Sequence, residues 1–360
     1  MRKKACLIFC LTIMLLFTSC KTTAGFTDIY RSVWAIQEAF RGTGGQTVQQ
    51  ETEGDASTKE ETANDTLFTG GQTAEASSGD EEYTVQELNF SRDGMKIYGK
   101  LFLPTGEGPF ATVIIGHGFG SDMSKTEGYA EAFAKNGIAG VSFDFIGGGD
   151  NIKSDGVTTD MSVLTEAADM GVVLDGIREM EICDRDNIFL MGRSQGGFVA
   201  TYTAAERVND IRGLIAFFPA YVIQDIVIEN TDNGRDIKDV SELNGVRIGR
   251  IYYEDALSFD IYEVMKSIDK NVLLIHGTAD DLAPYPYSVR AAETMPHAQL
   301  ITIEGAGHGF EGEDDAYAVK CAVEFVKDNM ILGSKGALAP NLIPLQAASC
   351  HYQDDVPVFL

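Results

Sequence analysis

Residues 188–198 constrain the fold of this chain more than any other segment. An apolar run of four residues leads into the sequence GRSQGG at residues 192–197, and a helical pattern follows directly. This order predicts a strand that enters a sharp turn and continues as a helix, with Ser194 at the turn. Glycines at both ends of the turn let the backbone pass close to its neighbours. The serine hydroxyl would then be exposed above the edge of a sheet, beside a helix N-terminus.

The segments around this turn predict an α/β protein. Eight short apolar runs read as strands, at residues 84–90, 96–103, 112–116, 137–145, 187–191, 213–218, 271–275 and 299–303. From the third run onward helical patterns intervene, for example at residues 128–135, 161–180, 197–208 and 316–330. Strands that alternate with helices indicate a mostly parallel eight-stranded sheet flanked by helices, here with an antiparallel pair at its start. Ligands of such sheets bind beyond the carboxyl ends of the strands.

The loop after the seventh run offers an acid. The sequence HGTADDLAP at residues 276–284 contains Asp280 and Asp281, and a carboxylate at the carboxyl end of a strand can orient a histidine. We prefer Asp280, because it stands four residues before Pro284, where the hydrolase pattern H-G-x-x-D-x-x-[VA]-P has its acid. Asp281 is expected to be solvated, and His276 is expected to be structural.

The loop after the eighth run offers a base. The sequence EGAGHGF at residues 304–310 places His308 between glycines, where its imidazole can turn toward a serine. His297 follows a proline and is expected at the surface, while His351 belongs to the C-terminal tail. We predict a catalytic triad of Ser194, His308 and Asp280, whose order along the chain is that of α/β-hydrolases.

The loop after the third run, GHGFG at residues 116–120, predicts an oxyanion hole. Small residues allow backbone N–H groups to face the site, and we assign the two donors to Phe119 and Gln195, the latter being the residue after the nucleophile. His117 lies within this loop, so its expected role is to brace the loop by hydrogen bonds.

With these residues in place, the stretch 83–330 resembles the α/β-hydrolase family, and more narrowly the bacterial feruloyl (cinnamoyl) esterases. The motifs that carry the resemblance lie at residues 116–119, 143–150, 192–197, 276–280, 287–288 and 305–310. The resemblance implies a serine carboxylesterase that works through an acyl-enzyme and uses no metal or cofactor. Two positions depart from the pattern: residues 146–150 read IGGGD where relatives commonly have G-H-G, and Ala283 stands where valine is more usual.

An insert at residues 219–270, after the sixth strand, is the candidate lid over Ser194. In the esterases that the chain resembles, such a lid builds the pocket for an aromatic acyl group. Tyr221, Tyr252 and Tyr253 are therefore candidate substrate-binding residues. The alternative is that these tyrosines only pack the lid onto the core, and the apolar pattern does not distinguish the two.

The N-terminus predicts export. Residues 1–19 combine a basic start, a short apolar stretch and small residues before Cys20, as in a signal peptide. Cys20 follows a lipobox-like sequence and would be the lipidated mature N-terminus, which would tether the protein to the extracellular face of the cell membrane. The alternative is a plain signal peptide and a secreted protein.

Composition assigns the remaining segments. Residues 20–82 are predicted to form a largely disordered acidic tether, since residues 51–82 hold ten acids and one base. Residues 331–360 form a tail without an assigned role. The net charge of −26 argues against nucleic acid as a partner and leaves the lipid anchor as the contact with a membrane. The expected substrate is a small-molecule or polysaccharide-linked ester.

Two other functions remain open. A serine peptidase of the dipeptidyl or acylaminoacyl type would share the nucleophile turn, although nothing here resembles the propeller domain that many such peptidases carry. A hydrolase fold used only for binding would need no triad, so the predicted triad disfavours it.

Overall fold

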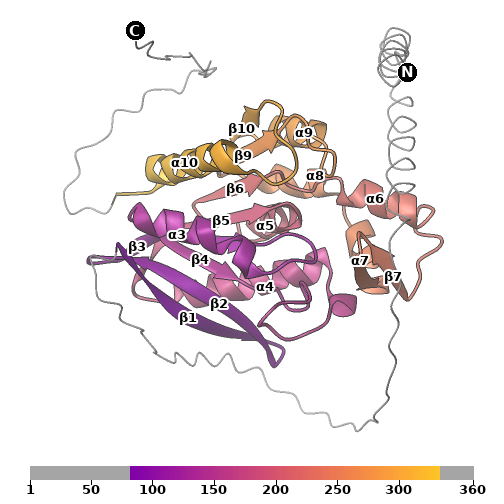
Figure 1. Ribbon diagram of the computed structural model, residues 1–360, viewed down its shortest axis with the longest axis horizontal. Coiled ribbons are helices and arrows are strands. Elements are labelled where there is room, and N and C mark those ends of the chain that lie inside the picture. Colours follow the sequence, from indigo (N-terminus) through magenta and orange to yellow (C-terminus); the bar gives the residue numbers. More distant parts are fainter. Residues whose placement is uncertain (1–81, 333–360) are drawn as a thin grey trace, which may run out of the picture. The chain divides into compact units, whose positions relative to one another are not determined.

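The computed structural model describes residues 82–332 (Figure 1). The predicted signal segment, Cys20, nearly all of the predicted tether and almost the whole of the tail lie outside these residues. Within the described part of the chain, no helix combines the length and the apolar composition that a membrane span needs. Cys183 is buried and Cys321 is half-buried, and neither forms a disulfide with another described residue.

An eight-stranded sheet forms the centre of the domain, as the sequence predicts. Its spatial order is β1-β2-β4-β3-β5-β6-β9-β10. Strand β2 is antiparallel to β1 and to β4, and the pairs from β4 through β10 are parallel. The strands are β1 (Tyr83–Arg92), β2 (Met95–Pro104), β3 (Phe110–Gly116), β4 (Ala139–Phe143), β5 (Cys183–Arg193), β6 (Gly213–Phe217), β9 (Asn271–Gly277) and β10 (Ala298–Ile303).

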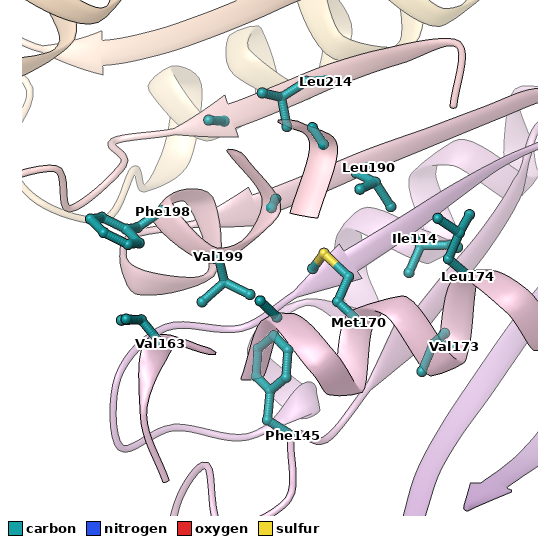
Figure 2. Close-up of a cluster of buried hydrophobic side chains, with 14 of the residues drawn as sticks. Ile114, Phe145, Val163, Met170, Val173, Leu174, Leu190, Phe198, Val199 and Leu214 are labelled. Atoms are coloured by element: carbon teal, nitrogen blue, oxygen red, sulfur yellow. The ribbon is translucent and has the colours of Figure 1, made fainter. Parts of the chain in front are cut away.

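Helices cover both faces of this sheet (Figure 1). Helices α3 (Glu127–Lys135) and α10 (Gly312–Asn329) pack on one face, and α4 (Val163–Arg178), α5 (Gln195–Glu206) and α9 (Pro286–Thr294) pack on the other. Figure 2 shows part of the second layer, where Met170 and Val173 of α4 lie against Ile114 and Leu190 of the strands. Parallel strands that are buried on both faces read as continuous apolar runs, which is why the sequence predicted them.

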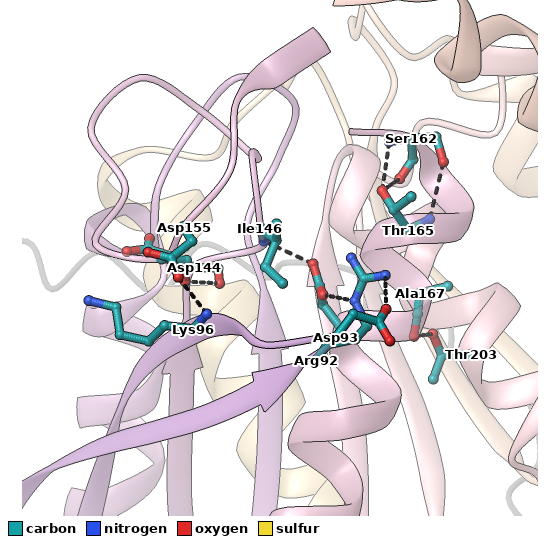
Figure 3. Close-up of polar contacts among 12 residues, drawn as sticks. Arg92, Asp93, Lys96, Asp144, Ile146, Asp155, Ser162, Thr165, Ala167 and Thr203 are labelled. Atoms are coloured by element: carbon teal, nitrogen blue, oxygen red, sulfur yellow. Dashed lines mark hydrogen bonds and ion pairs between the residues drawn. The ribbon is translucent and has the colours of Figure 1, made fainter. Parts of the chain in front are cut away.

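Several elements differ from the predicted ranges: β5, for example, begins at Cys183 rather than at residue 187, and α10 begins at Gly312 rather than at residue 316. For two others the structure gives the reason. The strand expected at residues 137–145 is shorter, because Gly137 adopts a left-handed φ of 79° in the turn that ends α3. The helix expected from residue 161 begins at Val163, because the Ser162 hydroxyl accepts the backbone N–H of Thr165 while the Thr165 hydroxyl binds the Ser162 backbone (Figure 3). This capping box satisfies amide groups that the first helical turn leaves unpaired.

The insert between β6 and β9 forms a small α/β unit. It contains α6 (Ile223–Asn230), the hairpin β7 (Val240–Leu243) and β8 (Val246–Gly249), α7 (Arg250–Leu257) and α8 (Ile261–Val264). The hairpin turns at Asn244 and Gly245, whose φ values are 50° and 81°. Short 3₁₀ segments occur at Met123–Lys125, Thr158–Asp160 and Met265–Ser267.

The hairpin packs onto the loop predicted to form the oxyanion hole. A side-chain carbon built on Gly120 would lie only 2.4 Å from Val246 Cγ2 at the start of β8. The insert is thus in contact with the loop at residues 116–120.

Candidate active site

The junction of β5 and α5 has the predicted strand–turn–helix geometry. Ser194 adopts φ 53° and ψ −123°, a conformation that non-glycine residues rarely hold. Its backbone N–H donates to the carbonyl of Phe217 at 3.0 Å, which fixes the turn against β6. A side-chain carbon on Gly192 would lie 2.0 Å from the carbonyl oxygen of Gly196, so the turn requires glycine there.

Three side chains meet at this turn. His308 Nε2 lies 2.9 Å from Ser194 Oγ, and His308 Nδ1 lies 2.8 Å from Asp280 Oδ2. They come from the β5–α5 turn, the loop after β10 and the loop after β9, which are far apart in sequence. Because a carboxylate accepts the Nδ1 proton, the Nε2 lone pair faces the serine hydroxyl and can take its proton.

The loop after β9 holds Asp280 in place. Its Oδ1 accepts the backbone N–H groups of Leu282 and Ala283 at 2.9 and 2.8 Å, and its Oδ2 receives His276 Nε2 at 3.1 Å. His276 is fully buried, and its Nε2 also lies 2.7 Å from the carbonyl of Ala283, so that nitrogen carries the proton. The other ring nitrogen accepts the hydroxyl of Ser288 at 2.6 Å. This is the structural role expected for His276.

Electrostatics keep Asp280 ionised. Burial on its own would raise the pKa of this carboxyl, but hydrogen bonds from His276 and His308 and the backbone N–H of Ala283 outweigh burial and hold the pKa well below its usual range. Asp281, the competing acid in the sequence, is exposed. The structure therefore brings Asp280, and not Asp281, to His308.

Of the predicted oxyanion donors, Gln195 directly follows Ser194, and Phe119 directly follows Gly118, which packs against Ser194. The glycine before Phe119 touches the turn, since a side-chain carbon on Gly118 would lie 3.3 Å from Ser194 Cβ. Gln195 is the first residue of α5, where backbone N–H groups have no acceptor within the helix. Backbone hydrogen bonds in the turns and loops of the described residues involve neither the Phe119 N–H nor the Gln195 N–H as a donor.

His117 braces the oxyanion loop, as predicted. The Phe145 N–H donates to its Nε2 at 3.2 Å, so Nδ1 carries the proton and donates to the Gly118 carbonyl at 2.9 Å. Burial lowers the pKa of His117, which keeps the ring neutral and able to accept. Asp144 has a similar structural role, because its carboxylate accepts the backbone N–H groups of Met123 and Lys153 at 2.7 Å each.

The three candidate substrate-binding tyrosines are buried and hydrogen-bonded within the protein. The hydroxyls of Tyr221 and Tyr253 pair with the hydroxyls of Thr201 and Ser241 at 2.7 and 2.8 Å. Tyr252 donates its hydroxyl to Gln195 Oε1 at 2.7 Å. This is the packing arrangement left open as the alternative, and contact with a substrate stays a prediction.

Glu166 of α4 is a polar residue near the site that the sequence argument missed. It is 1% exposed, and its Oε2 accepts Gln195 Nε2 at 2.8 Å. The signal was present in the sequence: residues 161–180 read as a helix whose buried face includes two acids, Glu166 and Asp169. An acid on the buried face of a helix needs a partner or a raised pKa, and so marks a position worth inspecting.

The described residues hold no cluster of three or more His, Cys, Asp or Glu side chains that could bind a metal ion. The three side chains can move one proton from the Ser194 hydroxyl to the His308 imidazole, which Asp280 orients. The backbone N–H groups at the start of α5 have no acceptor within the helix.

Two family models and one curated protein match parts of this chain. A family model described as "Serine aminopeptidase, S33" matches residues 107–241, and one described as "TAP-like protein" matches residues 259–331. Human monoglyceride lipase is 25% identical over 150 residues, which are 41% of this chain and 45% of the lipase. The match thus spans less than half of that relative's length.

Several solved structures share the fold. Est1E from Butyrivibrio proteoclasticus with bound ferulic acid superposes with a TM-score of 0.61 at 24% identity, covering 67% of this chain and 98% of that one. The α/β-hydrolase GrgF from Penicillium sp. sh18 gives a TM-score of 0.58 at 20% identity, with 68% and 99% covered. Mouse α/β-hydrolase domain-containing protein 10 gives 0.53 at 20% identity, with 68% and 98% covered.

Proposed function

We propose that this chain, which has the α/β-hydrolase fold, is a serine hydrolase of carboxylic esters. The strongest support comes from two hydrogen bonds. His308 Nε2 lies 2.9 Å from Ser194 Oγ, and His308 Nδ1 lies 2.8 Å from Asp280 Oδ2. These contacts activate a serine that its backbone turn already exposes.

The proposed reaction has two halves. In the first, His308 Nε2 takes the Ser194 proton while Oγ bonds to the ester carbonyl carbon, and the carbonyl oxygen becomes an oxyanion facing the N–H groups of Phe119 and Gln195. The ester C–O bond then breaks, and the leaving alcohol takes the proton from His308. In the second half, a water attacks the acyl-enzyme under the same base and releases the acid. Asp280 stabilises the imidazolium in both halves.

For the acyl group we propose a feruloyl or related aromatic acid. The sequence motifs resemble those of feruloyl esterases, and the structural neighbour Est1E was solved with ferulic acid bound. Tyr221, Tyr252 and Tyr253 belong to the insert, and the Tyr252 hydroxyl donates to Gln195, the residue after the proposed nucleophile. A monoacylglycerol is the competing ester, because the curated relative is a monoglyceride lipase.

A second candidate function is amide hydrolysis by a serine aminopeptidase, which the description of one matching family favours. The same nucleophile, base and oxyanion donors would serve an amide, so the two candidates differ only in the substrate.

A panel of substrates separates these functions. Methyl ferulate, a monoacylglycerol, p-nitrophenyl butyrate and an aminoacyl p-nitroanilide are assayed with the wild-type protein and with Ser194→Ala as the background. We expect turnover of the esters, with methyl ferulate preferred. Amide turnover without ester turnover would overturn the esterase proposal in favour of the peptidase.

We also propose export and lipid anchoring through Cys20, on the sequence alone. The protein is expressed in a bacterium that processes lipoproteins, and the cells are extracted with a detergent that separates into a detergent phase and an aqueous phase. The wild-type protein should enter the detergent phase. Cys20→Ala should stay in the aqueous phase, and equal partition of both proteins would contradict the anchor.

A further inference from the structure

The side chain of Gln195 is held at both ends of its amide. Its Oε1 accepts the Tyr252 hydroxyl at 2.7 Å, and its Nε2 donates to Glu166 Oε2 at 2.8 Å. Gln195 is 1% exposed, so water cannot replace either partner without a rearrangement. These two contacts join helix α4, the start of α5 and the lid helix α7 at the residue that follows the nucleophile.

Tyr252 touches both predicted oxyanion donors. While its hydroxyl binds Gln195, its ring lies edge-on to the ring of Phe119, with centroids 5.6 Å apart. Helix α7 is fixed to the body of the domain one turn further on, where the Ser162 hydroxyl that caps α4 donates to Asp255. The lid helix therefore has a defined position relative to the oxyanion loop and to α4.

Glu166 supports Gln195 from the opposite side, and its environment favours the neutral acid. Oε1 is buried and has no hydrogen-bond partner among the described residues. Burial raises the pKa of Glu166 well above its usual range, and the nearby Asp169 acts in the same direction. The Arg92 guanidinium pairs with Asp169 at 2.6 Å. A neutral carboxyl can accept the Gln195 amide without a buried charge.

We propose that Tyr252 and Glu166 are positioning residues that fix the Gln195 side chain from two sides and thereby hold its backbone N–H in the oxyanion hole. The proposal rests on the proposed serine hydrolase function. The backbone at Ser194 is strained, and a strained turn keeps its geometry only when its surroundings determine it. The hydrogen bonds that hold the Gln195 side chain help to determine the geometry of this turn. Because one anchor belongs to the lid, stabilisation of the oxyanion depends on the seating of α7.

The reaction step that should respond is the addition of Ser194 Oγ to the carbonyl. There the C–O bond forms, the carbonyl π pair moves to oxygen, and the proton passes to His308. Tyr252→Phe removes only the hydroxyl and keeps the ring on Phe119. We expect kcat to fall about 5- to 10-fold with KM within about twofold, since the loss of one buried hydrogen bond affects the transition state.

Tyr262→Phe is the matched control. Tyr262 also lies in the insert, is 5% exposed, and donates its hydroxyl to the Tyr287 carbonyl at 3.0 Å, away from Gln195. Both variants lose one buried tyrosine hydroxyl, so a general loss of lid stability should lower both melting temperatures alike. Only Tyr252→Phe should lower kcat.

Two substitutions test Glu166. Glu166→Leu fills the site but leaves the Gln195 amide without an acceptor, whereas Glu166→Gln keeps an uncharged acceptor. We expect Glu166→Gln to lose less kcat than Glu166→Leu. Equal losses in the two variants would contradict a neutral, positioning Glu166.

The most direct readout is binding of an aryl trifluoromethyl ketone, to which Ser194 adds to form a stable tetrahedral oxyanion. In Tyr252→Phe its affinity should fall by the same factor as kcat/KM, and in Tyr262→Phe it should be unchanged. Unchanged ketone affinity and kcat in Tyr252→Phe, or equal losses in both variants, would overturn the proposal. If the wild type hydrolyses esters and Ser194→Ala does not, the proposed function stands independently of this result.

Discussion

His276 and His308 approach the same oxygen of Asp280, with Nε2 and Nδ1 lying 3.1 and 2.8 Å from Oδ2. One imidazole is fully buried and bonded on both nitrogens, while the other faces the serine. The first histidine thus fixes the carboxylate that orients the second. The chemistry at Ser194 consequently depends on a residue that does not touch it.

His276→Phe tests this dependence. The phenyl ring fills the space but removes the hydrogen bonds to Asp280, Ala283 and Ser288. We expect kcat to fall roughly 10- to 150-fold, because a hydrogen bond to a charged group contributes about 1.5–3 kcal/mol. Ser288→Ala, which removes only the partner of the far nitrogen, should cost less. Steady-state kinetics on p-nitrophenyl butyrate measure both, and unchanged kcat in His276→Phe would contradict the role of that residue.

The choice between the two neighbouring acids has its own test. Asp280→Asn should lower kcat by roughly 10³- to 10⁴-fold, because an amide orients the base in the wrong tautomer. Asp281→Asn changes an exposed side chain and should leave kcat within about twofold. Burst and steady-state kinetics distinguish them, and a comparable loss in both variants would show that the assignment of the acid is wrong.

Packing of the nucleophile turn predicts a strong dependence on glycine. Gly192→Ala would place a carbon 2.0 Å from a backbone oxygen of Gly196, which forces the turn to open. We expect loss of activity and a melting temperature lower by several degrees. Gly128→Ala is the control, because a side-chain carbon at this position in α3 would meet no atom of another element within 4 Å. It should raise the free energy of unfolding by about 0.4–1 kcal/mol. Thermal unfolding followed by circular dichroism measures both, and a Gly192→Ala protein as stable and active as wild type would contradict the packing.

The buried Asp169 predicts a pH dependence of stability. Burial raises its pKa to about 6 from 3.8, although Arg92 and the backbone N–H of Ile146 bind it. Between these values the folded state binds more protons than the unfolded state, so this group makes the protein less stable as pH rises from about 4 to 6. The shift corresponds to about 3 kcal/mol as an order of magnitude.

Asp169→Asn removes this titration. The free energy of unfolding of wild type minus that of Asp169→Asn should therefore decrease across pH 4 to 6.5 in denaturant titrations. A difference that is constant or increases with pH would contradict a raised pKa for Asp169.

Much of the fold could be predicted because its signals are local. Continuous apolar runs marked the parallel strands, and glycines marked the loops at their carboxyl ends. The turn at Ser194 was readable since its strand, glycines and helix are contiguous. Ser194, His308 and Asp280 lie far apart in sequence, so their assignment depended on knowing that carboxyl ends of parallel strands share one edge. The structure brings these three side chains together.

The interior of the insert at residues 219–270 could not be predicted in the same way. The β7–β8 hairpin had a readable signal, the Asn244–Gly245 pair between short apolar runs, which favours a hairpin turn. The hydrogen bond between Tyr252 and Gln195 had no readable signal, because it joins residues of α7 and α5 that lie 57 positions apart in the sequence. The contact between Glu166 and Gln195 likewise joins α4 to α5, and no local pattern in the sequence indicates it.

We propose that Ser194 is the nucleophile. Covalent labelling with a fluorophosphonate, followed by peptide mass spectrometry, tests this most directly when ester turnover is measured on the same proteins. We expect one adduct on the wild-type protein, at Ser194. Ser194→Ala should lose both labelling and turnover while it retains its melting temperature. Labelling at another residue, or turnover that persists in Ser194→Ala, would contradict this proposal.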